Sequence, residues 1–255
     1  MSASRDDIVR HLADTLQPES IADACPQGLQ VEGRDSVDAV AFAVSVCEEV
    51  IRAAAAFGAG MLVVHHGMFW DRDPRVLRGA AKGRVKALLG HDISLLCYHL
   101  CLDCHETLGN NARFADLLDL QDRVPFGSYH GRYIGVLGRL ADSCAPQTFA
   151  ANVDALLEVP GPSALFLGGT RPVSRVAIVT GSAAGLLEQA AEAGADLYLT
   201  GEPGEGTFSL ARELGLHMLA AGHYRTERLG PLALKERIEQ RFAVRTTFID
   251  IPNTV

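Results

Sequence analysis

The sequence predicts an α/β protein made of two similar halves, each with a largely parallel sheet flanked by helices. Two observations support this fold class. Short apolar, β-prone segments alternate with helix-like segments, as in parallel sheets whose strands are joined by helices. In addition, residues 55–67 (AAFGAGMLVVHHG) align without gaps on residues 190–202 (AAEAGADLYLTGE), which suggests an internal duplication.

The predicted elements of the first half follow a helix–strand alternation. An amphipathic helix is expected within residues 1–16, and an Ala-rich helix ends near Gly58. A further helix is expected around residues 75–89. Buried strands are expected at 37–47, 61–67 and 93–99, where apolar residues run almost without interruption.

The second half repeats this order. Strands are expected at 173–181, 195–201, 216–223 and 244–251, and helices at 182–194, 208–215 and 227–241. Two apolar segments and a helix near 146–158 lie before them. We therefore divide the chain into an α/β half at 1–123 and another at 124–255, which can be intertwined. We expect no additional domain inserted between them.

Composition restricts the class of protein. Hydrophobic residues make up 48% of the chain and charged residues 21%, as in ordinary globular proteins. The net charge of -8 argues against nonspecific nucleic-acid binding. The sequence has neither an apolar run long enough to span a membrane nor a signal-peptide pattern. We expect a cytoplasmic protein whose six cysteines are reduced rather than joined in a disulfide framework.

Histidines and carboxylates gather at three predicted strand ends, where functional groups of parallel sheets collect. They are, in chain order, His65, His66, His99, Asp103, His223 and Glu227. Imidazole and carboxylate ligands suit zinc, iron or manganese. Six candidates exceed the needs of one tetrahedral ion, so we predict two divalent metal ions per chain. A polar rim without metal is the alternative, because each short pattern alone also occurs by chance.

Other patterns offer weaker candidates. The spacing of Cys97, Cys101 and Cys104 matches the three thiolates that hold an iron–sulfur cluster in radical S-adenosylmethionine enzymes, but Cys97 lies in an apolar strand and should pack there. The Gly-rich turn at 201–206 could bring backbone amides to a phosphate, although its glutamates favour a plain loop. The basic stretch at 72–86 is either a solvated helix face or a guide for an anionic substrate.

Four segments in order resemble the NIF-three-like family, which is also known as GTP cyclohydrolase 1 type 2. They are GLQVEGR (28–34), LVVHHGMFW (62–70), CYHLCLDCHETLGNNARFADLL (97–118) and AAGHYRTE (220–227). The resemblance covers most of the chain. It implies a NIF-three-like fold, a toroidal homohexamer and a dinuclear metal centre. It assigns metal ligation to His65, His66, Asp103, His223 and Glu227, and places His99 beside the metals, in either a supporting or a catalytic role.

This sequence also departs from the family. The residues between His99 and Asp103 differ from the family's Thr-Asn, and the turn at 202–206 lacks the further His or Ser of many members. These changes spare the ligands but alter the pocket wall. The substrate of a relative can therefore not be assigned to this protein.

Two functions are implied by the resemblance. The first is a metal-dependent hydrolase like GTP cyclohydrolase, acting with a metal-activated water on a small-molecule, nucleotide-type substrate. The second is a non-catalytic metal-binding regulatory or metal-handling protein that acts through protein partners. A variant that loses its metal should discriminate between these functions. An enzyme would lose turnover together with the metal, whereas a scaffold would keep its partner binding.

Overall fold

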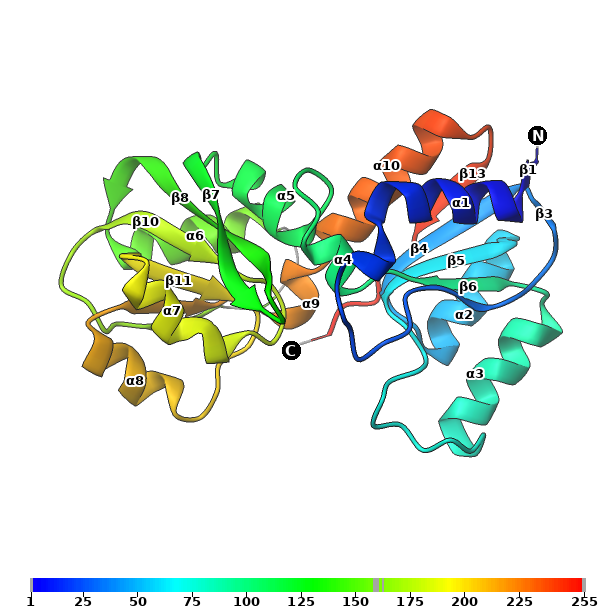
Figure 1. Cartoon of the computed structure of the whole chain (residues 1–255), viewed down its shortest axis with the longest axis horizontal. Helices are drawn as coiled ribbons and strands as arrows, with labels where there is room; N and C mark the ends of the chain where they lie inside the picture. The colour runs from blue at the N-terminus through cyan, green and yellow to red at the C-terminus, as the bar shows by residue number, and fades with distance from the viewer. Residues whose placement is uncertain (1, 158–160, 162, 254–255) are drawn as a thin grey trace. The chain divides into compact units, whose positions relative to one another are not determined.

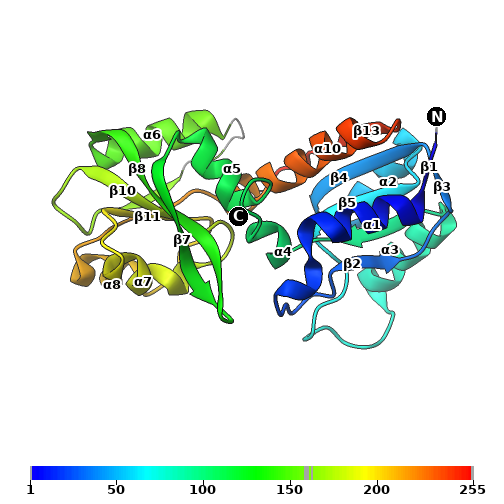
Figure 2. The ribbon, with the colours of Figure 1, turned by 45° about the horizontal axis from the view of Figure 1, so that its top comes forward.

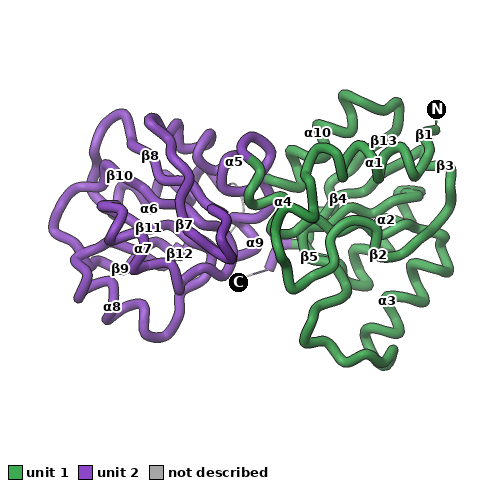
Figure 3. The backbone as a smooth tube through the Cα atoms, viewed as in Figure 1, with its two compact units in different colours: residues 1–105, 230–251 green, residues 106–229, 252–255 purple. Residues whose placement is uncertain are grey.

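A computed structural model describes residues 2–157, 161 and 163–253. The chain forms two compact units (Figure 3). Unit 1 comprises residues 1–105 and 230–251, and unit 2 comprises residues 106–229 and 252–255. The C-terminal helix and strand thus return to the unit that the N-terminal part of the chain builds.

Unit 1 contains a five-stranded sheet whose three central strands are parallel. In sheet order the strands are β13 (Arg245–Phe248), β4 (Ala39–Ser45), β5 (Met61–His66), β6 (Ser94–Cys97) and β2 (Gly28–Val31). β13 pairs with β4 in parallel and β2 pairs with β6 antiparallel, while β1 (Ala3–Ser4) and β3 (Ser36–Val37) form a separate pair. The predicted strands at 37–47, 61–67 and 93–99 are the parallel core of this sheet.

Helices cover both faces of the unit 1 sheet (Figures 1 and 2). Those of this unit are α1 (Arg5–Leu16), the 3-10 turn η1 (Pro18–Ser20), α2 (Glu48–Phe57), α3 (Gly79–Gly90), α4 (Leu100–Asp103) and α10 (Leu229–Arg241). α1 and α10 lie on one face, and α2 and α3 on the other. Successive strand residues point to opposite faces, so Leu62, Val64 and Cys97 pack toward α2 and α3.

The ends of α2 show how the sequence fixes its limits. Cys47 is the N-cap, and its Sγ accepts a hydrogen bond from the backbone amide of Val50. Glu48 and Glu49 occupy the first turn, where negative charge is favourable. Gly58 ends the helix at φ +83°, a left-handed conformation that glycine adopts without steric cost.

Unit 2 contains a six-stranded mixed sheet. In sheet order the strands are β7 (Gln121–Tyr129), β8 (Arg132–Cys144), β10 (Val173–Ile178), β11 (Leu197–Thr200), β12 (His217–Ala220) and β9 (Ala164–Phe166). β10, β11 and β12 are parallel, as the sequence predicted, and the hairpin of β7 and β8 adds two antiparallel strands. The helices are α5 (Asn110–Leu117), α6 (Pro146–Leu156), η2 (Ala184–Leu186), α7 (Leu187–Glu192), α8 (Thr207–Leu214) and α9 (His223–Thr226).

The core of unit 2 lies between the sheet and the helices α5 and α6. Ile178, Leu199 and Leu219 of the parallel strands pack with Phe114 of α5 and Phe149 of α6, and all five are almost fully buried. α7 and α8 lie on the other face of the sheet (Figures 1 and 2). Among the described residues, no helix combines the length and apolarity needed to cross a membrane.

The two units share a strand order. In unit 1, β2 pairs antiparallel with the third of the parallel strands β4, β5 and β6. In unit 2, β9 pairs in the same way with the third of the parallel strands β10, β11 and β12. One-turn helices, α4 and α9, come directly after the third strand in each case. This common topology supports the predicted duplication, which superposition of the two units would test.

Candidate metal centre

His65 lies at the end of β5 and is fully buried. Its Nδ1 lies 2.9 Å from the backbone carbonyl oxygen of Tyr98, so Nδ1 carries the hydrogen and donates it. The other ring nitrogen, Nε2, lies 3.5 Å from Oδ2 of Asp103. A backbone carbonyl that fixes the tautomer and orientation of an imidazole is the usual support of a metal-binding histidine.

His66 is the next residue and is held by a different partner. Its Nδ1 lies 2.8 Å from Oγ of Ser45, which ends the neighbouring strand β4. The rings of His65 and His66 have centroids 4.7 Å apart although their Cβ atoms leave opposite faces of the strand. This approach is possible because both residues lie at the last positions of β5, where the strand gives way to the loop.

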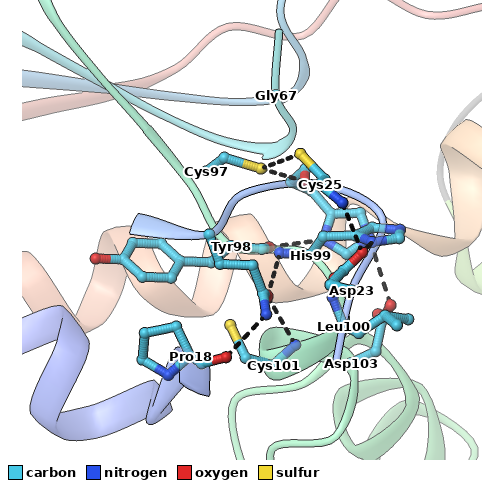
Figure 4. A network of polar contacts seen from close by, with 12 residues as sticks. Pro18, Asp23, Cys25, Gly67, Cys97, Tyr98, His99, Leu100, Cys101 and Asp103 are labelled. Atoms are coloured by element: carbon cyan, nitrogen blue, oxygen red, sulfur yellow. Dashed lines mark hydrogen bonds and ion pairs between the residues drawn. The ribbon is translucent and has the colours of Figure 1, made fainter. Parts of the chain in front are cut away.

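His99 is held by the carboxylate of Asp23. Nδ1 of His99 lies 3.0 and 2.9 Å from the two carboxylate oxygens, and the Asp23 side chain is only 3% exposed. Oδ2 of Asp23 also accepts the backbone amide of Leu100, and Oδ1 accepts that of Cys25 (Figure 4). Burial raises the pKa of Asp23, but His99 and the two amides outweigh it and hold the pKa of this carboxyl below its usual range.

Gln27 fixes the backbone on which His99 stands. Its Oε1 accepts the amides of His99 and Cys101, at 3.1 and 3.0 Å, and its Nε2 donates to the carbonyl of Pro18. The segment that starts α4 is therefore held by two side chains from the loop before β2. Since Asp103 ends α4, this arrangement also sets the position of the buried carboxylate.

The three imidazoles of unit 1 form a cluster with metal-ligand geometry. One ring nitrogen of each of His65, His66 and His99 lies within 4.8 Å of the others. Because Nδ1 of each ring has its own hydrogen-bond partner, Nε2 is the candidate nitrogen for metal binding or proton transfer. The ring of Trp70 lies beside the cluster, 5.1 Å from that of His99 and 6.2 Å from that of His66. The donor set fits a divalent ion such as zinc, iron or manganese.

Unit 2 holds a second cluster, made of one imidazole between two carboxylates. Nε2 of His223 lies 2.9 Å from Oε2 of Glu227, and Nδ1 contacts Oε1 of Glu202 in a short hydrogen bond. Burial works to lower the pKa of His223, but Glu227 and Glu202 outweigh it and raise the pKa to about 9. These surroundings favour positive charge on the ring and equally suit a cation.

Close backbone packing fixes the carboxylate of Glu227. The side chain is 4% exposed, and a Cβ placed on Gly181 would lie 2.1 Å from Oε1 of Glu227. Gly181 has φ +71°, and its amide donates to Oγ1 of Thr226, which in turn donates to the carbonyl of His223. Only a residue without a side chain fits at position 181 beside this glutamate.

The predicted site residues thus fall into two sets. Within unit 1 the structure brings together His65, His66, His99 and Asp103, and within unit 2 it brings together His223 and Glu227. Sequence reasoning missed Asp23, Ser45 and Glu202. Glu202 comes directly after the strand segment 195–201, which could have drawn attention to it, whereas Asp23 lies in a loop with no pattern.

The weaker candidates find structural roles. The amides of Gly201 and Glu202 both donate to the carbonyl of Gly181, so they are not directed at a phosphate. Cys97 is buried in β6, as expected, where its thiol donates to the carbonyl of His65. Among the described residues, no cluster with metal-ligand geometry includes a cysteine. The basic stretch at 72–86 lies on the exposed loop before α3 and along that helix.

Comparison with known proteins places the whole chain in one sequence group. The model of the family described as Duf34/NIF3 (NGG1p interacting factor 3) matches residues 3–254. A protein of Pseudomonas aeruginosa is 42% identical over 239 residues, which cover 93% of both chains. One of Pyrococcus abyssi is 38% identical over 248 residues, which cover 97% of this chain and 98% of that one. Both are named GTP cyclohydrolase 1 type 2 homolog.

Solved structures with the same fold cover almost the full chain. The protein ybgI, described as of unknown function, has a TM-score of 0.92 at 35% identity and covers 99% of this chain and 100% of its own. TTHA1606 from Thermus thermophilus has a TM-score of 0.88, also at 35% identity, with the same coverage. Reduced HcgD from Methanocaldococcus jannaschii shares the fold, with a TM-score of 0.86 at 22% identity over 98% of this chain and 99% of that one.

Proposed function

Because the chain belongs to the Duf34/NIF3 family, we propose that it is a metal-dependent hydrolase that acts on a nucleotide-type substrate. The observation that carries the proposal is the cluster of three imidazoles, each fixed through Nδ1 and each with a nitrogen within 4.8 Å of the others. Histidines that only fill space in a core would need neither convergent rings nor a separate hydrogen-bond partner for each Nδ1.

In this proposal His65, His66, Asp103, His223 and Glu227 hold two divalent ions. The two imidazoles and the carboxylate that unit 1 supplies are enough for one ion with an open position, so the second carboxylate–imidazole pair is what calls for two. When bound, such ions make a coordinated water acidic enough to attack at neutral pH and polarise the group under attack.

The chain's own groups supply orientation and proton transfer. The carboxylate of Asp23 keeps the hydrogen of His99 on Nδ1, which leaves Nε2 to accept a proton from the attacking water and return it to the leaving group. Ser45 and the carbonyl of Tyr98 keep the two neighbouring rings from rotating.

Metal content gives the first test. Protein purified without an affinity tag should contain two divalent ions per chain by elemental analysis, and His66→Ala and His223→Ala should each lower that content. His91→Ala is the matched control, because His91 is exposed at the end of α3 and outside both clusters. Unchanged metal content in both site variants would contradict the ligand assignment.

Turnover gives the second test. Metal-loaded protein is incubated with GTP, and formate and a dihydroneopterin product are measured. Turnover of other nucleotides or phosphoesters without formate would keep the hydrolase class and reject the cyclohydrolase reaction. The name NGG1p interacting factor 3 describes protein binding by a relative, so a metal-loaded chain that turns over no substrate would favour the regulatory alternative.

The assembly stays a prediction as well. The resemblance implies a homohexamer in the cytoplasm, and light scattering after size-exclusion chromatography would measure the mass of the particle against the 27.3 kDa of one chain.

A further inference from the structure

Two buried thiols lie side by side next to His65 and Asp23 of unit 1. Sγ of Cys25 lies 3.5 Å from Sγ of Cys97, and the two residues are 1% and 0% exposed (Figure 4). Cys25 stands in the loop before β2, and Cys97 ends β6. A disulfide has an S–S distance of about 2.05 Å, so the two sulfur atoms would have to approach by about 1.5 Å.

The surroundings of the two sulfur atoms orient them toward each other. Gln30 donates through Nε2 to Sγ of Cys25 at 3.3 Å, and the thiol of Cys97 lies 3.2 Å from the carbonyl oxygen of His65. Gln30 itself is fixed, because its Oε1 accepts the amide of Met68. A buried cysteine that serves only as a small hydrophobe needs no polar partners, whereas this pair has one on each side.

We propose that Cys25 and Cys97 are a redox modification site, at which mild oxidation by a peroxide forms an intrachain disulfide. The Cys25 thiol attacks one peroxide oxygen, which gives a sulfenic acid and one water. The Cys97 thiol then attacks the sulfenic sulfur, the S–S bond forms and the second water leaves. In total, two thiols lose two electrons and two protons to hydrogen peroxide, which becomes two waters.

We expect peroxide to reach Cys25 before Cys97. The segment 21–27 has no regular secondary structure, so it can open locally at a lower free energy than the sheet. Cys97 belongs to β6, which is paired on both sides by β5 and β2. The loop therefore provides the access and the movement, while the strand provides a fixed second sulfur.

The disulfide would act on the histidine cluster through two hydrogen bonds of the same residues. The amide of Cys25 donates to Oδ1 of Asp23, the carboxylate that holds His99. The thiol of Cys97 donates to the carbonyl of His65, and this bond is lost when the sulfur is oxidised. We expect the oxidised protein to bind metal more weakly. This consequence rests on the proposed function, whereas formation of the disulfide does not.

Mass spectrometry of the full-length protein tests the modification directly. The protein is treated with a few equivalents of hydrogen peroxide, alkylated under denaturing conditions and digested with trypsin without reduction. The expected product joins the peptides 11–34 and 87–113, lacks two hydrogens and separates on reduction. Since the second peptide also contains Cys101 and Cys104, fragment ions must place the link on Cys97.

Variants provide the controls. Cys25→Ala and Cys97→Ala should each abolish the linked peptide, while Cys144→Ala, in unit 2, should keep it. The wild-type measurement needs no variant to fold. The proposal is overturned if Cys25 and Cys97 are both alkylated after treatment while Cys47 or Cys144 is oxidised, or if Cys25 stops at the sulfinic acid.

Calorimetric metal titration of the oxidised and the reduced protein distinguishes formation of the disulfide from its effect on the histidine cluster. A linked peptide with at least a tenfold loss of metal affinity supports both. A linked peptide with unchanged affinity overturns the coupling to the histidine cluster alone. A linked peptide in a protein that binds no metal in either state refutes the proposed function and leaves the redox site standing.

Discussion

Asp23 and His99 are 76 positions apart in the sequence, yet both carboxylate oxygens of Asp23 lie within 3.0 Å of Nδ1 of His99. The same carboxylate accepts the amide of Leu100, the first residue of α4. One side chain therefore sets both the tautomer of the imidazole and the start of the helix that carries Asp103. Removal of the Asp23 carboxylate should therefore affect catalysis more than folding if His99 transfers a proton.

Asp23→Asn tests this role of the carboxylate. The amide keeps an acceptor for one backbone N–H but loses the negative charge that fixes the hydrogen of His99 on Nδ1. We expect kcat to fall about 10- to 100-fold, the range for partners that orient site histidines, while metal content is kept. Asp92→Asn, at an exposed turn, should leave kcat unchanged. Equal losses of kcat and metal would indicate a purely structural role.

Ser45→Ala removes the partner of His66 without touching a proposed ligand. The hydroxyl lies 2.8 Å from Nδ1, and its loss lets the ring rotate. We expect metal affinity, measured by calorimetry, to fall about 10- to 100-fold. Ser36→Ala, on the exposed side of β3, is the control. Identical affinities of the two variants would show that Ser45 does not support a ligand.

Gly181→Ala tests the steric fixation of Glu227, and Gly131→Ala is a closely matched control. The two glycines have φ of +71° and +76°, so an alanine at either position carries similar backbone strain of about 1 kcal/mol. A Cβ at 181 would collide with Oε1 of Glu227, whereas no atom lies within 4 Å of one at 131. Both variants should lose stability, but only Gly181→Ala should also lose metal. Equal metal contents would contradict the steric argument.

Asp154→Asn tests the pH dependence of unit 2. Nη2 of the buried Arg225 lies 2.9 Å from Oδ1 of Asp154. Burial raises the pKa of Asp154, but Ser163 and Arg225 outweigh it and hold the pKa below its usual range. Because the folded-state pKa is the lower one, the stabilisation is present above the unfolded pKa of about 4 and is lost as the pH falls through the folded value.

Because the Asp154 side chain is 34% exposed and solvent screens the pair, we expect Asp154→Asn to lower the free energy of unfolding by only about 1 kcal/mol at pH 7, and by progressively less as the pH falls below 4. Denaturant unfolding at several pH values measures this difference. The exposed Asp142 provides the control substitution, Asp142→Asn, which should change stability little. A difference that stays constant between pH 7 and pH 3 would contradict the assignment.

Strand-end residues were predictable because a local rule places them. His65, His66 and His99 stand at the ends of apolar runs, and parallel strands bring the ends of such runs to one edge. Asp23 has no such signal, since it stands in a loop and meets His99 only through the folding of the intervening chain. The same holds for Cys25 and Cys97, which are 72 positions apart.

Local sequence patterns also could not show to which unit the last strand of the chain belongs. The strand at 244–251 was recognised from its composition, but its partner is set by long-range pairing. Arg245 lies opposite Ala39, and Phe248 opposite Phe42, so β13 extends the sheet of unit 1 rather than that of unit 2. The hairpin of β7 and β8 was missed in part because β7 is polar, with exposed residues over most of its length.

The return of the chain to unit 1 has a consequence for the order of synthesis. Every strand of unit 2 lies between residues 121 and 220, so its sheet can close while the ribosome still holds the C-terminal helix and strand. The edge of β4, in contrast, stays unpaired until β13 has been synthesised, about 200 residues later. During translation the first unit to begin is therefore the last to finish, and its open strand edge is the part of the nascent chain most in need of protection.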